Sequence, residues 1–534
     1  MSLVLSEPQT SKFWIRYSVF SPHSTTMADQ PVAVSRMFLP NPSELRTRIF
    51  VGMRWTVWLS ILALPFSFGT NVILARIGPE AIGTFGLLAV YISIVAAFLY
   101  LGGDSVIIKF IPELAAERRV SFLLTYLLIV GAALCLWLAL FFKWPEQLRY
   151  LFGNKGSSSF YLLVLYLSPI YIVFSMIVAA LKGLLEIRAA QSLTRGINIG
   201  SFCIYAVLFL FAHQSLTANY TTWVWTIYLG ITAVLAAVGL QRLFSVPSFD
   251  WRTSRWQFFL PRGFWKYLFA TQQLSILGFF VGRLDYVLVL RFGNLRTLGQ
   301  YAAITTVALL IPQVNMYFLD SLLPSLTNLF ASSDLSAASE IFSVYMRISF
   351  IVNAATTCAL LLLSSVVLKI LGPEYASLRV PLIVTILLTG IANPGAVGNI
   401  LLSSVGKQQR AVYIAIVQFA LYCTLFYLLW PSWHLLGAII AYGSAICISY
   451  MASLVVAGRC VPIKISVARE YAVFTLLAIF TAAAGFFLKS SLSLLAAPLW
   501  IFSMALFLLF SGYRGAEIRI LIRCFLPAFQ TGNA

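Results

Sequence analysis

Long apolar segments, separated by short polar connections, occupy most of the chain between residues 55 and 511. A membrane-spanning helix needs about 20 predominantly apolar residues, and the chain contains about fourteen segments of that kind. The predicted spans are 55–76, 85–108, 121–142, 159–181, 196–212, 222–240, 264–290, 300–330, 343–369, 379–403, 411–430, 433–457, 470–488 and 494–511. The pattern therefore predicts an all-α polytopic membrane protein with about 14 transmembrane helices.

Composition agrees with this class. Of the 534 residues, 60% are hydrophobic and 10% are charged, whereas soluble domains carry about 25% charged residues. The net charge of +19 does not indicate nucleic-acid binding, because Lys and Arg separate the apolar segments instead of forming a basic domain. The seven Cys show no metal-ligand spacing and no cofactor motif is present, so we expect neither a metal nor a cofactor.

The distribution of basic residues predicts the orientation. With a cytoplasmic N-terminus, inside segments carry about 25 Lys and Arg and outside loops about 9, as the positive-inside rule requires. Both termini are then cytoplasmic, in the cytoplasmic (inner) membrane. Residues 1–42, rich in Ser, Pro and Thr, are predicted to be a disordered cytoplasmic tail, and residues 512–534 a second cytoplasmic tail.

The first twelve spans form an internal repeat. "ARIGPEAIGTFGLLA" (75–89) resembles "LRFGNLRTLGQYAAI" (290–304), with Arg76 on Arg291 and, after one inserted residue, Phe85 on Tyr301. Six spans per copy give both copies the same topology, and parallel repeats pack about an axis along the membrane normal with a cavity between them. We expect an N-lobe at 43–242, a cytoplasmic linker at 243–263, a C-lobe at 264–457 and two further helices at 458–511.

The repeat also aligns two acidic residues. Asp104 follows Phe85 by the same spacing as Asp320 follows Tyr301, and a Ser comes after each. Acids at membrane depth are candidate proton or ion sites. The structural alternative for each is a buried polar contact, such as an Asp that caps a broken helix or pairs with Lys109.

Arg283 and Asp285 interrupt the apolar run "FFVGRLDYVLVLRFG" (279–293). Residues at i and i+2 do not share a helix face, so Arg283 is expected to have another partner, either a protein group or a ligand. A guanidinium binds a diphosphate well through forked hydrogen bonds. Arg283 is therefore the first candidate for the substrate site, and Asp285 is a further candidate for a proton or ion.

Lys109 and Arg76 are additional cationic candidates for the central cavity. Both lie near the ends of predicted spans. Lipid headgroups attract long basic side chains at such positions, and this simpler interpretation is favoured for both residues.

Several of these stretches resemble a known family. "ILARIGPEAIGTFGLLAVY", "GRLDYVLVLRFGNLRTLGQYAAI" and "DSLLPSLTNLFASSD" are similar to polysaccharide or O-antigen flippases of the multidrug/oligosaccharidyl-lipid/polysaccharide (MOP) superfamily. The resemblance covers roughly residues 50–511. It implies two helical lobes that carry a polyprenyl-diphosphate-linked oligosaccharide from the inner to the outer leaflet by alternating access. It also implies membrane lipids and glycan-assembly enzymes as partners, and transport instead of enzyme activity.

Other functions remain open at this stage. A cation-coupled multidrug antiporter of the same superfamily is one, although such antiporters usually have an acid in the first span and 55–76 contains none. A passive lipid scramblase is another. A membrane glycosyltransferase is disfavoured, because the external loops are short and no catalytic domain is evident.

Overall fold

All regular secondary structure in the described part of the chain is helical. The structure, a computed structural model, describes residues 42–143, 158–247, 249, 251, 257–319, 326, 335–405, 407–461, 466–487 and 495–511. The predicted tails lie outside these residues, apart from Pro42, with which the first helix begins.

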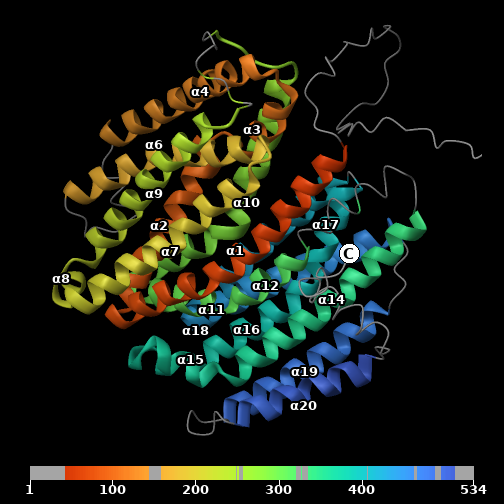
Figure 1. The fold of residues 1–534 in the computed structure, drawn as a ribbon. Coiled ribbons are helices and arrows are strands. Elements are labelled where there is room, and N and C mark those ends of the chain that lie inside the picture. The colour runs from red at the N-terminus through yellow and green to blue at the C-terminus, as the bar shows by residue number, and fades with distance from the viewer. Residues whose placement is uncertain are drawn as a thin grey trace, which may run out of the picture.

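The helices before residue 250 form the N-lobe. They are α1 (Pro42–Ile77), α2 (Pro79–Ile94), the π-helix η2 (Val95–Leu99), α3 (Gly103–Glu113), α4 (Ala116–Lys143), α6 (Ser158–Gly183), α7 (Ile187–Phe211), α8 (His213–Ala218) and α9 (Tyr220–Phe244). Helix α6 packs against α3, α4, α7 and α9, and α1 packs along α7. Figure 1 shows α4, α6 and α9 together on one side of the molecule.

The C-lobe and two additional helices follow. They are α10 (Phe264–Phe292), α11 (Leu295–Ala308), α12 (Leu310–Leu319), α14 (Leu335–Leu362), α15 (Ser364–Leu371), η3 (Pro373–Leu378), α16 (Arg379–Ala392), η4 (Asn393–Gly395), α17 (Ala396–Ser404), α18 (Gln408–Gly458), α19 (Val467–Phe487) and α20 (Ala496–Ser511). In Figure 1, α14, α16, α19 and α20 lie on the side opposite α4, α6 and α9.

Within the described residues, twelve helical segments are long and apolar enough to cross a membrane. One of them, Gln409–Gly458, has 50 residues, more than twice the length that a span requires. Its backbone leaves the helical conformation at His434 (φ 44°, ψ −121°), three residues after Pro431, at the second residue of the predicted span 433–457 and close to the end of 411–430. Helix α20 has 16 residues. A total of fourteen, which counts α18 twice and includes α20, stays a prediction.

Sequence signals explain where several helices begin. The Oδ1 atom of Asn294 accepts a hydrogen bond from the backbone N of Thr297 at 2.8 Å and so caps α11. Helix α2 begins with Pro79 after Gly78, and η3 begins with Pro373 after Gly372. Both glycines have positive φ (153° and 133°), and proline at the first position has the φ that a helix requires.

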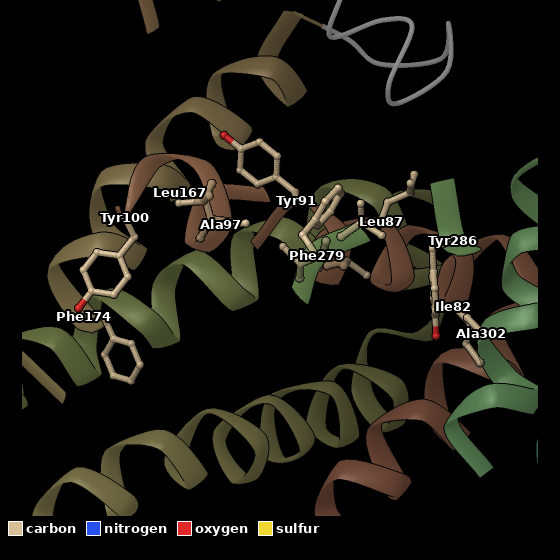
Figure 2. Close-up of a cluster of buried hydrophobic side chains, with 14 of the residues drawn as sticks. Ile82, Leu87, Tyr91, Ala97, Tyr100, Leu167, Phe174, Phe279, Tyr286 and Ala302 are labelled. Atoms are coloured by element: carbon tan, nitrogen blue, oxygen red, sulfur yellow. The ribbon is translucent and has the colours of Figure 1, made fainter. Parts of the chain in front are cut away.

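One buried hydrophobic cluster extends through both lobes. It includes Leu87 and Tyr91 of α2, Phe279 and Tyr286 of α10, and Ala302 of α11 (Figure 2). A second cluster joins the C-lobe to the additional helices through Phe350 of α14, Phe474 of α19 and Phe507 of α20. Helices α19 and α20 therefore pack on the C-lobe.

The lobes approach each other most closely where α2 meets α11. An added Cβ at Gly83 would lie 3.2 Å from the backbone N of Gly299, and one at Gly299 would lie 3.0 Å from the backbone N of Gly83. Each would also collide with a carbonyl oxygen, that of Leu295 for Gly83 and that of Pro79 for Gly299. The repeat that aligns Phe85 with Tyr301 also aligns these two pairs, as a pseudo-twofold axis between the helices requires.

The helix that begins at α2 is broken at its other end. The π-helix η2 is followed by Leu101 (φ 51°) and Gly102 (φ 68°) before α3 begins. The freed carbonyl of Tyr100 accepts a hydrogen bond from the Tyr126 hydroxyl at 2.6 Å. The Ala97 carbonyl accepts one from Gln272 Nε2 of α10 at 2.7 Å. The break is thus satisfied by neighbouring side chains, one of which comes from the other lobe.

Candidate functional site

Arg283 lies toward the C-terminal end of α10, a helix of the C-lobe that also contacts the N-lobe. Helix α10 packs against α2, η2 and α3 on one side and against α11 and α18 on the other. The partly buried side chain of Arg283 borders two cavities, one between the lobes and one inside the C-lobe. Its guanidinium carbon lies 5.6 Å from the ring centroid of Tyr286. A single cation therefore faces both spaces.

Arg283 has no carboxylate within salt-bridge distance in the part of the chain that the structure describes. Two of the ion pairs there are Arg242–Glu186 and Arg296–Glu374, each at 3.1 Å. Asp285 is two positions along the helix and does not pair with Arg283, as the i, i+2 spacing predicts. Within the described residues, no carboxylate therefore competes with an anionic ligand for the guanidinium.

Asp285 is buried, with 3% of its surface exposed. Its Oδ2 atom accepts a hydrogen bond from the Tyr301 hydroxyl at 2.7 Å, whereas its Oδ1 atom has no hydrogen-bond partner among the described residues. The neighbouring Tyr286 hydroxyl is hydrogen-bonded to the Thr305 hydroxyl at 2.9 Å. A buried carboxylate oxygen without a donor is costly, and a proton or a small cation would satisfy it.

The cavity inside the C-lobe has a volume of about 300 Å³ and is enclosed by α10, α11, α16 and α18. Arg283 and Asp285 line it together with tyrosines and neutral polar residues. These are Tyr286, Tyr301, Thr305, Thr385, Thr389, Asn393, Tyr442 and Tyr450. A volume of this order suits a small ligand or a headgroup portion.

The sequence analysis did not select most of these lining residues. One signal was present in the repeat, because Tyr301 stands where the N-terminal copy has Phe85. The register that aligns Arg291 with Arg76 likewise sets Arg283 and Asp285 against Phe68 and Thr70. The C-terminal copy therefore carries charged and hydroxyl groups at positions where the N-terminal copy has at most one hydroxyl.

The cavity between the lobes has a volume of about 350 Å³. Its wall is made mostly of small residues of α2, η2 and α10, with Phe279 and Arg283 as the larger ones. Gly278 and Gly282 leave this face of α10 open, because an added Cβ at either position would meet no atom within 4 Å. Arg283 supplies the positive charge of this space.

Asp104 lies in the first turn of α3, directly after the break in the helix, and is exposed. Lys182 of α6 and Tyr100 are its electrostatic neighbours. Asp104 lines neither of the two cavities next to Arg283. Its proposed partner by the repeat, Asp320, lies outside the described residues, so their relation in space stays a prediction.

Lys109 and Arg76 also lie apart from both cavities. The Lys109 ammonium is 4.1 Å from the ring centroid of Tyr267, in the first turns of α10. Arg76 donates two hydrogen bonds across the lobes, from Nε to the Ile370 carbonyl (2.7 Å) and from Nη2 to the Lys369 carbonyl (2.9 Å). Each of these cations therefore joins the two lobes, Lys109 at one end of the interface and Arg76 at the other.

The described residues contain no group of three or more His, Cys, Asp or Glu side chains arranged to hold a metal ion. The described cysteines are free, and Cys358 is buried.

No protein-family model matches the sequence, and no curated protein matches it significantly. Solved structures do match. A lipid II flippase MurJ in an inward closed conformation superposes with a TM-score of 0.69 and 13% identity, over 88% of this chain and 99% of that chain. An inward-facing multidrug resistance MATE family transporter of the MOP superfamily gives a TM-score of 0.62 and 11% identity, over 76% and 98%.

A MOP superfamily transporter from Pyrococcus furiosus, described as having a binding pocket of reversed polarity, is similar as well. Its TM-score is 0.54 and its identity 14%, over 79% of this chain and 96% of that chain. At such identities the similarity concerns the fold and not the substrate. The chain therefore has the two-lobed helical fold that these transporters share.

Proposed function

We propose that this protein is a flippase that moves a polyprenyl-diphosphate-linked oligosaccharide from the inner to the outer leaflet by alternating access. The observation that carries the proposal is Arg283, a cation without a carboxylate partner in the described residues that faces the cavity between the lobes. Forked guanidinium donors suit a diphosphate. The fold, which is similar to that of a lipid II flippase, is compatible with this proposal.

In this mechanism the lobes, proposed at 43–242 and 264–457, rock about the axis between α2 and α11. With both termini in the cytoplasm of an inner-membrane protein, the contact of Gly83 with Gly299 lies at the outer end and closes it. The diphosphate enters from the inner side and binds Arg283, while the polyprenyl chain stays in the lipid. When the outer contact separates, the headgroup is released outward.

Asp285 is the proposed site of the coupling proton or cation. It lines the same C-lobe cavity as Arg283, and one of its oxygens has no hydrogen-bond partner in the described part of the structure. Binding of a cation there changes the charge beside the guanidinium, and at short range in a low dielectric such a change is large. Asp104 and Asp320 remain candidates for a second titrating pair, and Lys109 and Arg76 for contacts in the wider cavity.

The test is the sidedness of a labelled lipid-linked oligosaccharide in vesicles that contain the purified protein, with and without a pH or Na⁺ gradient. Wild type should move the lipid, and Arg283→Ala should not, although it inserts normally. Arg283→Lys retains the charge but not the fork and should be intermediate. Transport by Arg283→Ala at the wild-type rate would remove the arginine from the mechanism. Movement that ignores both gradients would indicate a passive scramblase.

A second candidate function is a cation-coupled antiporter for small organic cations. The observation that favours it is the C-lobe cavity, in which a buried carboxylate is surrounded by tyrosine rings. Aromatic faces and a carboxylate together bind organic cations. Efflux of a cationic dye that depends on Asp285, without movement of lipid-linked glycans, would favour the antiporter.

A further inference from the structure

A chain of hydrogen-bonded polar side chains leads away from the C-lobe cavity. Asn393, in the cavity wall, donates from Nδ2 to Asn353 Oδ1 of α14 at 2.6 Å. Asn353 donates to the backbone O of Ser349 at 2.6 Å and to its Oγ at 3.2 Å. Asn315 of α12 donates to the same Ser349 Oγ at 3.1 Å. All four residues are buried.

This hydrogen-bonded series of side chains is more polar than packing alone requires. Three amides and a hydroxyl in the core of a membrane protein cost free energy that apolar residues of the same size would not. Each of the three asparagine amides donates a hydrogen bond, but among the described residues the Asn315 Oδ1 atom has no partner, and neither has Thr357 Oγ1, one turn of α14 beyond Asn353. Buried acceptors of this kind are commonly satisfied by ordered water.

The hydrogen-bonded series runs from the cavity toward one end of the helical bundle. From the cavity it passes to Asn353, then one turn back along α14 to Ser349, and then to Asn315, in the second half of α12. It therefore runs toward the end of the bundle where α12 ends and α14 begins. In the proposed topology this is the cytoplasmic end.

Comparison of the two repeats indicates that this hydrogen-bonded series belongs to the C-lobe alone. In the register that aligns Phe85 with Tyr301, Asn315 corresponds to Leu99, a buried residue of η2. The polar chain thus starts in the lobe that also contains Asp285, next to the same cavity.

We infer that Asn393, Asn353, Ser349 and Asn315 line a water-filled branch of the C-lobe cavity that opens toward the cytoplasmic end. Neutral amide and hydroxyl oxygens bind water and small monovalent cations without holding them tightly. Such groups form a path for a cation, whereas a carboxylate forms a stopping point. The role as an exit for the cation from Asp285 rests on the proposed function, but the presence of water does not.

Accessibility to a small, positively charged methanethiosulfonate reagent tests the inference directly. Ser349→Cys is nearly isosteric, and the native Cys358 on the same helix is a matched dry control, because it is fully buried against Thr481. Peptide mass spectrometry distinguishes the two labels within one tryptic fragment, so the other cysteines can stay. Because water must reach one position and not the other, the thiol introduced by Ser349→Cys should react at least about tenfold faster than that of Cys358.

Equal and negligible labelling of both cysteines in the folded protein would mean a dry polar core and would overturn the inference. If the Ser349→Cys protein does not insert into the membrane, the labelling rate of Asn353→Cys is compared with that of Cys358 in the same way. Labelling needs no transport, so a failed flipping assay leaves this result intact. The coupling role is tested separately: Asn353→Leu should abolish the effect of a Na⁺ or pH gradient on transport, whereas Asn353→Ser should retain it.

Discussion

Gly83 and Gly299 occupy equivalent positions in the two halves of the chain, and each lies against the backbone of the other's helix. An ordinary side chain at either position would hold α2 and α11 apart. Because the contact joins one lobe to the other, the two lobes can meet at this end only when α2 and α11 approach to backbone contact. The pair is a structural expression of the internal repeat, since residues on a twofold axis meet their own equivalents.

The first prediction concerns this pair. Gly299→Ala should destabilise the closed interface by about 1–3 kcal/mol, the usual cost of overpacking. The two ends of α1 and α15 nearest the contact should then move apart, measured as a longer distance between spin labels there. Gly230→Ala is the matched control, because an added Cβ at Gly230 meets no atom within 4 Å. An unchanged distance in Gly299→Ala would show that the glycines do not govern closure.

The second prediction concerns the cross-lobe contact of Arg76. Removing its two hydrogen bonds to the carbonyls at the C-terminus of α15 should shift the lobes toward separation at this end. Because Arg76 is exposed to solvent, each bond should contribute only about 0.5–1 kcal/mol, and the two together correspond to roughly a tenfold change in the equilibrium. Crosslinking of introduced cysteines across α1 and α15 should fall accordingly in Arg76→Ala.

Arg296→Ala is the control for that experiment. It also removes an exposed arginine, but its partner Glu374 lies in the same lobe. Its effect on crosslinking should be negligible, as expected for an exposed pair. A similar decrease in crosslinking in both variants would mean that surface charge, and not the hydrogen bonds between the lobes, determines the distance between α1 and α15.

A third prediction tests Arg283 by binding, apart from transport. If the guanidinium contacts the diphosphate, Arg283→Ala should weaken binding of a soluble polyprenyl-diphosphate analogue by about 2 kcal/mol or more, as loss of a charge-assisted contact implies. The affinity for the corresponding monophosphate should fall less, because a single phosphate forms fewer hydrogen bonds with the guanidinium. Lys182→Ala removes a cation that lines neither cavity next to Arg283 and should change neither affinity. Equal losses for both analogues would argue against forked binding.

The sequence was sufficient for the class of fold and for the repeat, whereas the role of Arg283 stays a prediction. The repeat could be recognised because Arg76 and Arg291 end corresponding helices, and Gly78 and Gly293 follow two residues later in each copy. The partners of the other charges could not be predicted. Arg76 bonds to backbone carbonyls nearly 300 positions away along the chain, and no residue pattern identifies a carbonyl as the acceptor.

The polar chain in the C-lobe was missed for a related reason. Asn315, Ser349 and Asn393 are neutral and are separated along the sequence, so each looks like an isolated polar residue in an apolar helix. Only the packing of α12, α14 and η4 brings them together. Neutral networks are set by tertiary contacts, whereas charges are evident from composition alone.

The last prediction concerns the hydrogen bond from Tyr301 to Asp285. Tyr301→Phe restores the residue type that the N-terminal copy has at Phe85, and it leaves both oxygens of the carboxylate without a side-chain donor. Loss of a hydrogen bond to a charged acceptor should destabilise the protein by about 1.5–3 kcal/mol, measured by thermal unfolding in detergent. Tyr286→Phe removes a bond between two neutral hydroxyls and should cost less, about 0.5–1.5 kcal/mol. If Asp285 holds the coupling cation, Tyr301→Phe should also weaken stabilisation by that cation, while Tyr286→Phe should not. Equal responses of the two variants to the cation would place its site elsewhere and leave the bond from Tyr301 to Asp285 a purely structural one.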